Sequence, residues 1–74
     1  MNLNETIKTI WETLLKIEVQ KDTDFFENGG NSLFAGIMIK KLQDQTGIII
    51  RIPELYKHSV FSDFCALAEN EYQK

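Results

Sequence analysis

The chain has 74 residues, of which 43% are hydrophobic, enough for one small core and for a single domain spanning residues 1–74. Asp and Glu outnumber Lys and Arg by 11 to 8, and the resulting net charge of −3 disfavours a nucleic-acid-binding module. Because the interior is too small for a deep catalytic pocket, and one Cys with one His provides neither a disulfide nor a zinc site, we expect no enzyme and no metal.

The first predicted helix covers residues 3–16. Its apolar residues recur at the spacing of an amphipathic helix: Leu3, Ile7, Ile10, Trp11, Leu14 and Leu15. Asn2 and Glu5, three residues apart, resemble a capping box at the start of this helix.

The loop over residues 17–31 is long for so small a domain, and loops of this length are uncommon unless they carry a function. Polar turn-forming residues mark its turns, and we expect Phe25 and Phe26 to anchor it to the core. Its acidic residues either form an ordinary solvated surface or steer a basic partner enzyme: Glu18, Asp22, Asp24 and Glu27.

The second predicted helix begins at or next to Ser32 and ends near Thr46, where Gly47 is typical of a helix end. Residues 48–52 are rich in Ile and resemble a strand. With no second strand to pair with, their backbone groups would stay unpaired in a sheet, so we interpret them as an extended connector.

A short third helix is predicted over residues 53–57, because Pro53 suits the first helical position. Ser59 is the expected N-cap of a fourth helix. The apolar stripe of that helix comprises Val60, Phe64, Leu67, Ala68 and Tyr72. The elements together predict an all-α fold, a small four-helix bundle of three longer helices and one short helix. The side chains expected in its core are Trp11, Leu14, Phe25, Leu42, Phe64 and Leu67.

The segment Gly29-Gly30-Asn31-Ser32-Leu33 fits none of the standard catalytic or phosphate-binding motifs. It lacks the second Gly and the preceding strand of a nucleophile elbow, and it lacks the Lys of a phosphate-binding loop. What remains is a serine at a helix start after two glycines, a pattern that a helix N-cap and a tight turn also explain.

A helical wheel of the second helix separates its apolar residues into two groups. The core-facing group comprises Ala35, Met38, Ile39 and Leu42. Leu33 and Ile37 fall on the polar side of the wheel instead, beside Ser32. Lys40 and Lys41 lie on that side too. Two exposed aliphatic side chains next to a helix-start serine indicate a docking surface, although scattered exposed apolar residues also occur without any function.

The run Phe25-Phe26-Glu27-Asn28-Gly29-Gly30-Asn31-Ser32-Leu33 resembles the phosphopantetheine attachment motif of peptidyl carrier proteins, the thiolation domains of nonribosomal peptide synthetases. The resemblance covers nearly the whole chain, since the Trp-bearing first helix, the segment Ile52-Pro53-Glu54-Leu55-Tyr56 and the last helix fall where the family has their counterparts. The chain departs from the family pattern at Asn31, where His or Asp is common, and at Asn28, where Leu is common. His58-Ser59 also replaces the usual Pro-Thr.

This resemblance implies that Ser32 carries a covalent 4′-phosphopantetheine arm, which holds aminoacyl, peptidyl or acyl groups as thioesters. Gly29, Gly30 and Asn31 belong to the same cofactor-binding segment, and the glycines leave room for a transferase to approach the hydroxyl. The partial positive charge of a helix N-terminus favours the phosphate. The carrier itself catalyses nothing and moves its cargo between separate enzymes.

The partners that the resemblance implies are a phosphopantetheinyl transferase, an adenylation enzyme or ligase, and downstream acyl-transfer or tailoring enzymes. Leu33, Ile37, Lys40 and Lys41 are the expected docking residues. No secretory signal and no apolar run of about 20 residues is present, so we expect a cytoplasmic protein that binds no membrane. We expect a monomer, either a free-standing carrier or an excised domain.

Two alternatives remain, an acyl carrier of polyketide or fatty-acid synthesis and an unmodified helical adaptor. Acyl carriers typically have an acidic recognition helix, whereas residues 32–43 contain no acid and include Lys40 and Lys41. His58 is interpreted as a turn residue and Cys65 as a buried small residue of the last helix.

Overall fold

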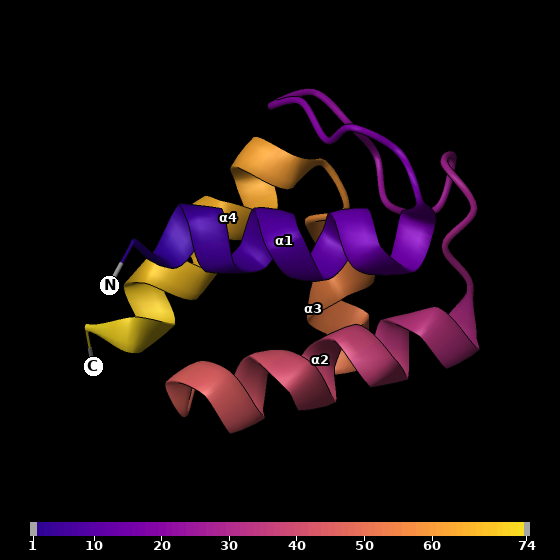
Figure 1. Cartoon of the computed structure of the whole chain (residues 1–74). Coiled ribbons are helices and arrows are strands. Elements are labelled where there is room, and N and C mark those ends of the chain that lie inside the picture. The colour runs from indigo at the N-terminus through magenta and orange to yellow at the C-terminus, as the bar shows by residue number, and fades with distance from the viewer. Residues whose placement is uncertain (1, 74) are drawn as a thin grey trace.

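The computed structural model describes residues 2–73 and contains four helices in that range: α1 (Leu3–Leu15), α2 (Ser32–Thr46), α3 (Ile52–Lys57) and α4 (Phe61–Tyr72). No strand occurs among the described residues, so the prediction of an all-α bundle with one short helix is confirmed. α1 packs against α2 and α4, and α3 packs against α2. Figure 1 shows the start of α1 and the end of α4 at one end of the bundle and the start of α2 at the other, while the α1–α2 loop folds back over the start of α4.

Local sequence determines three of the helix ends as predicted. The Asn2 side chain accepts a hydrogen bond of 3.2 Å from the Glu5 amide at the start of α1. α2 ends at Gly47, whose φ of 79° lies in the left-handed region that glycine adopts readily. α3 begins one residue before Pro53, which therefore lies in its first turn.

The prediction that Ser59 caps α4 is wrong, because Val60 takes the N-cap position and α4 begins at Phe61. The Ser59 hydroxyl instead donates a hydrogen bond of 2.8 Å to the Asp24 carboxylate. The Ser59 carbonyl accepts another, also of 2.8 Å, from the Phe25 amide. These partners belong to the distant α1–α2 loop, so the sequence around Ser59 carries no sign of them.

The core is organised around the indole ring of Trp11. This ring packs against Phe25 of the loop and against Phe61 and Phe64 of α4, with centroid distances of 5.0, 5.2 and 5.7 Å. All four rings are buried. The indole N–H has no hydrogen-bond partner among the described residues, so Trp11 stabilises the fold through apolar and aromatic packing.

Four of the six side chains predicted for the core are buried: Trp11, Phe25, Leu42 and Phe64. Leu14 and Leu67 are half-buried and pack against the margin of the core. The connector after α2 forms neither helix nor strand, and the burial of its side chains alternates, a pattern typical of extended backbone. Ile48 and Ile50 are buried, whereas Ile49 between them is exposed.

Asp24 fastens the α1–α2 loop to the start of α4. One of its carboxylate oxygens accepts hydrogen bonds from the amides of Phe26 and Glu27, at 2.9 and 3.1 Å, and the other accepts from the Ser59 hydroxyl. An antiparallel backbone bridge between Asp24 and Val60 joins the same segments. Burial pushes the pKa of Asp24 up, but the hydrogen bonds to its carboxylate outweigh that effect, so the pKa lies below its ordinary value of 3.8.

Asp24→Asn is expected to lower the free energy of unfolding at neutral pH by about 2 kcal/mol, because an amide replaces a charged hydrogen-bond acceptor. Since the folded-state pKa of Asp24 is depressed, its stabilisation is fully present above 3.8 and is lost as the pH falls through that value and below. In urea unfolding experiments, the stability difference between wild type and variant should therefore stay constant above about pH 5 and shrink as the pH falls below that value.

The matched control is Asp22→Asn, which changes an exposed acid of the same loop. We expect this control to alter the unfolding free energy by less than about 0.5 kcal/mol. A stability loss in Asp24→Asn that does not change with pH would contradict the role assigned to the ionised carboxylate.

Candidate functional site

Ser32 is the first residue of α2, and its side chain is exposed. Asn31 is the N-cap, since its side-chain oxygen accepts a hydrogen bond of 2.9 Å from the Phe34 amide. The Asn31 carbonyl also accepts a hydrogen bond of 2.8 Å from the Ala35 amide. The interpretation of Ser32 as a capping serine is therefore wrong, and its hydroxyl is left available for other chemistry.

The two glycines before Asn31 occupy backbone positions where a side chain would be strained or would clash. Gly29 has a φ of 102°, which side chains rarely tolerate. At Gly30 a Cβ atom would overlap the ring and the carbonyl oxygen of Phe25, and the Gly30 amide donates to that oxygen at 2.9 Å. The glycines thus hold the loop against a buried core residue and lead it into α2, a reason that the sequence analysis did not give.

Tyr56 of α3 reaches Ser32, a contact that the sequence analysis missed. The two hydroxyl oxygens lie 3.3 Å apart and share a hydrogen bond. The Tyr56 ring stacks on Phe26 with a centroid distance of 4.4 Å and an interplanar angle of 2°. Because Tyr56 follows Ser32 by 24 residues, no local pattern could pair them.

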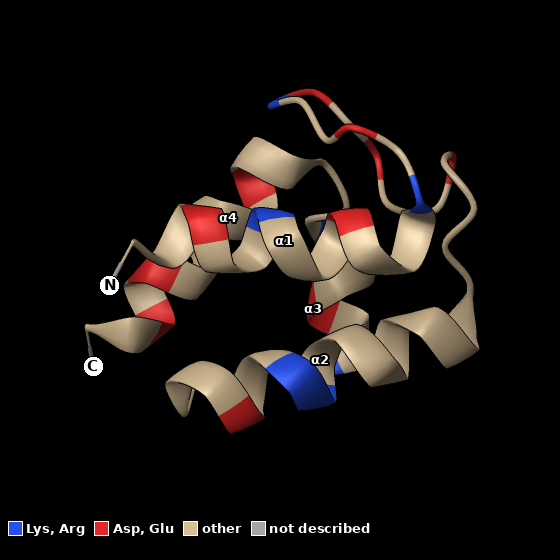
Figure 2. Ribbon diagram, viewed as in Figure 1, with Lys and Arg blue, Asp and Glu red and all other residues tan. Residues whose placement is uncertain are grey.

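The surroundings of Ser32 suit a phosphate ester. The amides of Ser32 and Leu33 lie in the first turn of α2, where the helix has no earlier turn whose carbonyls could accept hydrogen bonds from them. The helix dipole adds partial positive charge at the same place. No acidic residue lies in that turn. Figure 2 shows that acids are absent from the beginning of α2 and that its first charged residues are lysines.

The predicted docking residues differ in their exposure. Leu33 is 69% exposed, as predicted, and Lys40 and Lys41 are exposed too. Lys40 forms an ion pair of 2.8 Å with Asp44 one turn later. Ile37 is half-buried, contrary to the wheel. Because α2 packs against both α1 and α3, its covered side is wider than a single core stripe, and Ile37 lies at the margin.

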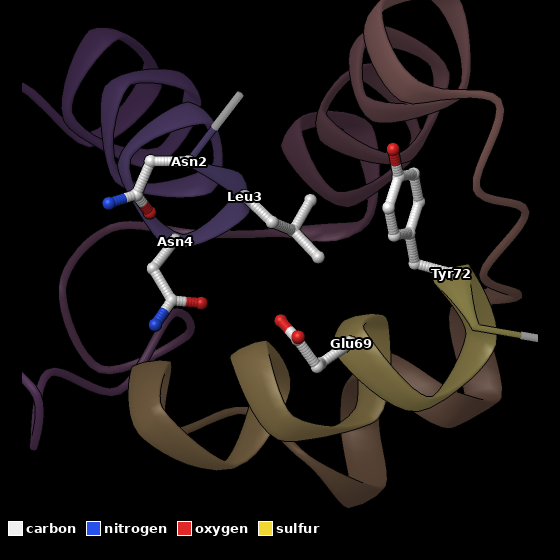
Figure 3. Close-up of a pocket in the computed structure, with 5 residues that line it drawn as sticks. All are labelled: Asn2, Leu3, Asn4, Glu69 and Tyr72. Atoms are coloured by element: carbon white, nitrogen blue, oxygen red, sulfur yellow. The ribbon is translucent and has the colours of Figure 1, made fainter.

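Open hollows lie at the other end of the bundle, near the chain ends. One, with a volume of about 540 Å³, is lined by Asn2, Leu3, Asn4, Glu69 and Tyr72, and Figure 3 shows these side chains around it. Another, of about 350 Å³, shares Tyr72 with the first and also borders residues 46–49 and Glu71. Neither is lined by a predicted site residue, so both are separate from Ser32.

The described residues contain no group of three or more His, Cys, Asp or Glu side chains arranged to hold a metal ion. Their helices are also too short or too polar for any one of them to cross a membrane.

The comparison with known families agrees with this geometry. A family model described as "Phosphopantetheine attachment site" matches residues 5–68. The chain belongs to this family. Membership implies a 4′-phosphopantetheine attached covalently to a serine, which confirms the predicted cofactor. The assignment of Ser32, with Gly29, Gly30 and Asn31, to the attachment site stays a prediction.

Similar proteins confirm the resemblance to peptidyl carriers. Surfactin synthase subunit 1 of Bacillus subtilis (strain 168) is 35% identical over 75 residues, which cover 96% of this chain and 2% of that protein. Nonribosomal peptide synthetase easA of Emericella nidulans is 24% identical over 68 residues, which cover 88% of this chain and 1% of that protein. The chain therefore spans only a small part of the length of these relatives.

A solved structure described as "Non Ribosomal PCP domain" shares the fold of this chain. The TM-score is 0.77 at 21% sequence identity, and the match covers 88% of this chain and 84% of the other. The four-helix arrangement around Ser32 is therefore the fold of a known peptidyl carrier domain.

Gly30→Ala is expected to lower the free energy of unfolding by about 1–3 kcal/mol, because the added Cβ overlaps Phe25. The matched control is Gly36→Ala in the interior of α2, where a Cβ meets nothing within 4 Å. This control should raise the unfolding free energy by about 0.5–1 kcal/mol, because alanine favours the helix. Urea unfolding followed by Trp11 fluorescence measures both, and equal effects of the two substitutions would show that Gly30 is not packed against Phe25.

Proposed function

We propose that Ser32 carries the 4′-phosphopantetheine arm and that the chain is a peptidyl carrier in nonribosomal-peptide-like biosynthesis. The observation that carries this proposal is the exposed hydroxyl at the first residue of α2, within the span of residues 5–68 that the attachment-site family model matches. The 35% identity to a region of surfactin synthase subunit 1 supports an aminoacyl or peptidyl cargo.

The chain's own residues prepare Ser32 for attachment without activating it chemically. Asn31 caps α2, so the Ser32 hydroxyl is not used as a cap and stays exposed, where a transferase can reach it. The first-turn amides offer partial positive charge to the phosphate. The modifying enzyme supplies the base and the metal for the transfer. When the arm is attached, its terminal thiol holds the acyl group as a thioester.

We assign no catalytic step to the carrier itself. The Nδ1 atom of His58 lies 3.1 Å from the Asp63 carboxylate, so this histidine has a partner in the same chain. Burial, together with the nearby charge of Glu69, raises the pKa of Cys65 to about 12. The Cys65 thiol is therefore protonated at neutral pH and is a poor nucleophile. The enzymes that load the arm and consume its cargo are then separate partners, among them an adenylation enzyme or ligase.

Ser32→Ala is expected to fold like the wild type, with an unfolding free energy within about 0.5 kcal/mol, because the side chain is exposed and caps nothing. The variant should gain no mass when incubated with coenzyme A and a broad-range phosphopantetheinyl transferase, whereas the wild type gains one arm. Intact-protein mass spectrometry measures this difference.

Ser62→Ala is the matched control, since Ser62 is an exposed serine of α4 and should not affect loading. An arm on the Ser32→Ala protein would show that a residue other than Ser32 carries it. A wild type that never gains the arm would instead favour an unmodified adaptor.

We further propose that Leu33 is the main apolar anchor for partner enzymes, with Ile37, Lys40 and Lys41 beside it. Leu33 is the most exposed large hydrophobic residue among those described, and it follows Ser32 directly. A carrier must bind several enzymes and leave each one quickly, which favours a small interface with few anchors. Ile37 lies one helical turn further along the same side and is half-buried, so it contributes a smaller apolar area.

Leu33→Ala is expected to lower kcat/KM for loading by the transferase about tenfold, the effect of losing one interface anchor. Ile49→Ala, at a site that is 58% exposed and lies beyond the far end of α2, should change it less than about twofold. Both variants should melt like the wild type. A transferase that loads both variants as fast as the wild type would rule out docking through Leu33.

A further inference from the structure

We propose that Tyr56 is a positioning residue for the Ser32 side chain and for the phosphodiester formed on it. The inference rests on the proposed attachment at Ser32. It begins with the shared hydrogen bond of 3.3 Å between the hydroxyls of Ser32 and Tyr56. This bond joins the first residue of α2 to α3, so two separate helices determine where the serine oxygen lies.

The Tyr56 ring is held by a series of aromatic contacts that starts in the core. Trp11 packs edge-on against Phe25 at 5.0 Å, and Phe25 packs edge-on against Phe26 at 5.3 Å. Phe26 then stacks on Tyr56 at 4.4 Å. Tyr56 is 53% exposed, but one face of its ring is covered by Phe26, and the buried pair Trp11–Phe25 supports that partner. The orientation of the exposed phenol is therefore tied to the most buried part of the molecule.

Attachment of the arm changes which group of the pair can donate. In the unmodified protein either hydroxyl can donate the hydrogen bond to the other. Once the Ser32 oxygen is esterified it has no proton, so Tyr56 is the one donor of the pair. The nearest acceptors are then the oxygens of the phosphodiester, which carry negative charge. A hydrogen bond to a charged acceptor is roughly twice as strong as one between neutral hydroxyls.

The consequence concerns the direction in which the arm leaves the protein. A phosphodiester at a helix N-terminus without a further partner can rotate about the serine side chain. Tyr56 adds a donor from α3 and so favours the rotamer in which the phosphate lies on the side of α2 that faces α3. The aromatic series then fixes the position of the phosphodiester from which the flexible arm starts. The far end of the arm stays free to enter the partner enzymes.

The test uses the phosphorus atom of the loaded protein as a reporter. Wild type, Tyr56→Phe and Tyr72→Phe are loaded with coenzyme A and a broad-range transferase, and intact mass shows that each carries one arm. Tyr56→Phe keeps a ring for the Phe26 stack and removes only the hydroxyl. Tyr72→Phe removes the hydroxyl of a tyrosine that is also about half exposed and that is the last residue of α4.

At neutral pH, we expect the ³¹P resonance of Tyr56→Phe to differ from that of the wild type, and that of Tyr72→Phe to coincide with it. Circular dichroism of each loaded protein shows that the helices persist.

A ³¹P resonance that is the same in Tyr56→Phe and wild type overturns the role of Tyr56. This outcome leaves the attachment itself intact. Failure of the wild type to gain an arm is seen earlier, by mass, and overturns the proposed function instead. The two failures are thus recorded by different measurements.

Discussion

The packing of Trp11 against Phe25 is the interaction on which the rest of this structure depends. It attaches a long polar loop to the core at a buried aromatic contact of 5.0 Å. The position of Phe25 then determines the next step, because Gly30 lies directly on its ring and carbonyl. Asn31 follows at once as the cap of α2, and Ser32 is the first helical residue. An exposed hydroxyl is thereby placed at a defined point by a contact in the centre of the molecule.

In a carrier, the folded protein holds the attachment point in place and the flexible arm moves the cargo. Asp24, the bridge to Val60 and the aromatic series hold the α1–α2 loop against α4 and α3. The modified side chain therefore stands on an ordered surface, although it follows a loop. Tethering keeps the cargo at a high effective concentration near each partner, so the protein surface needs to provide only brief recognition. The exposed Leu33 beside the attachment point suits that requirement.

Most helix positions could be predicted from the sequence because local signals determine them. Amphipathic spacing in α1 and the Ser32–Gly47 boundaries of α2 both depend on residues within one or two turns. The start of α4 was missed because Ser59 bonds to Asp24, a partner in another segment. The exposure of Ile37 was overestimated because a helical wheel does not include the packing of α3 against α2. Tyr56 was missed for the same reason, since only the folded chain brings α3 next to Ser32.

The central claim is that Ser32, among the three serines of the chain, carries the phosphopantetheine arm. The other two lie at the start of α4, where Ser59 donates its hydroxyl to Asp24 and Ser62 is exposed. Proteolysis of the loaded wild-type protein and fragmentation of its peptides by tandem mass spectrometry locates the added group directly. We expect every fragment that bears the arm to contain Ser32 and none to require Ser59 or Ser62. An arm located on Ser59 or Ser62 would contradict the account.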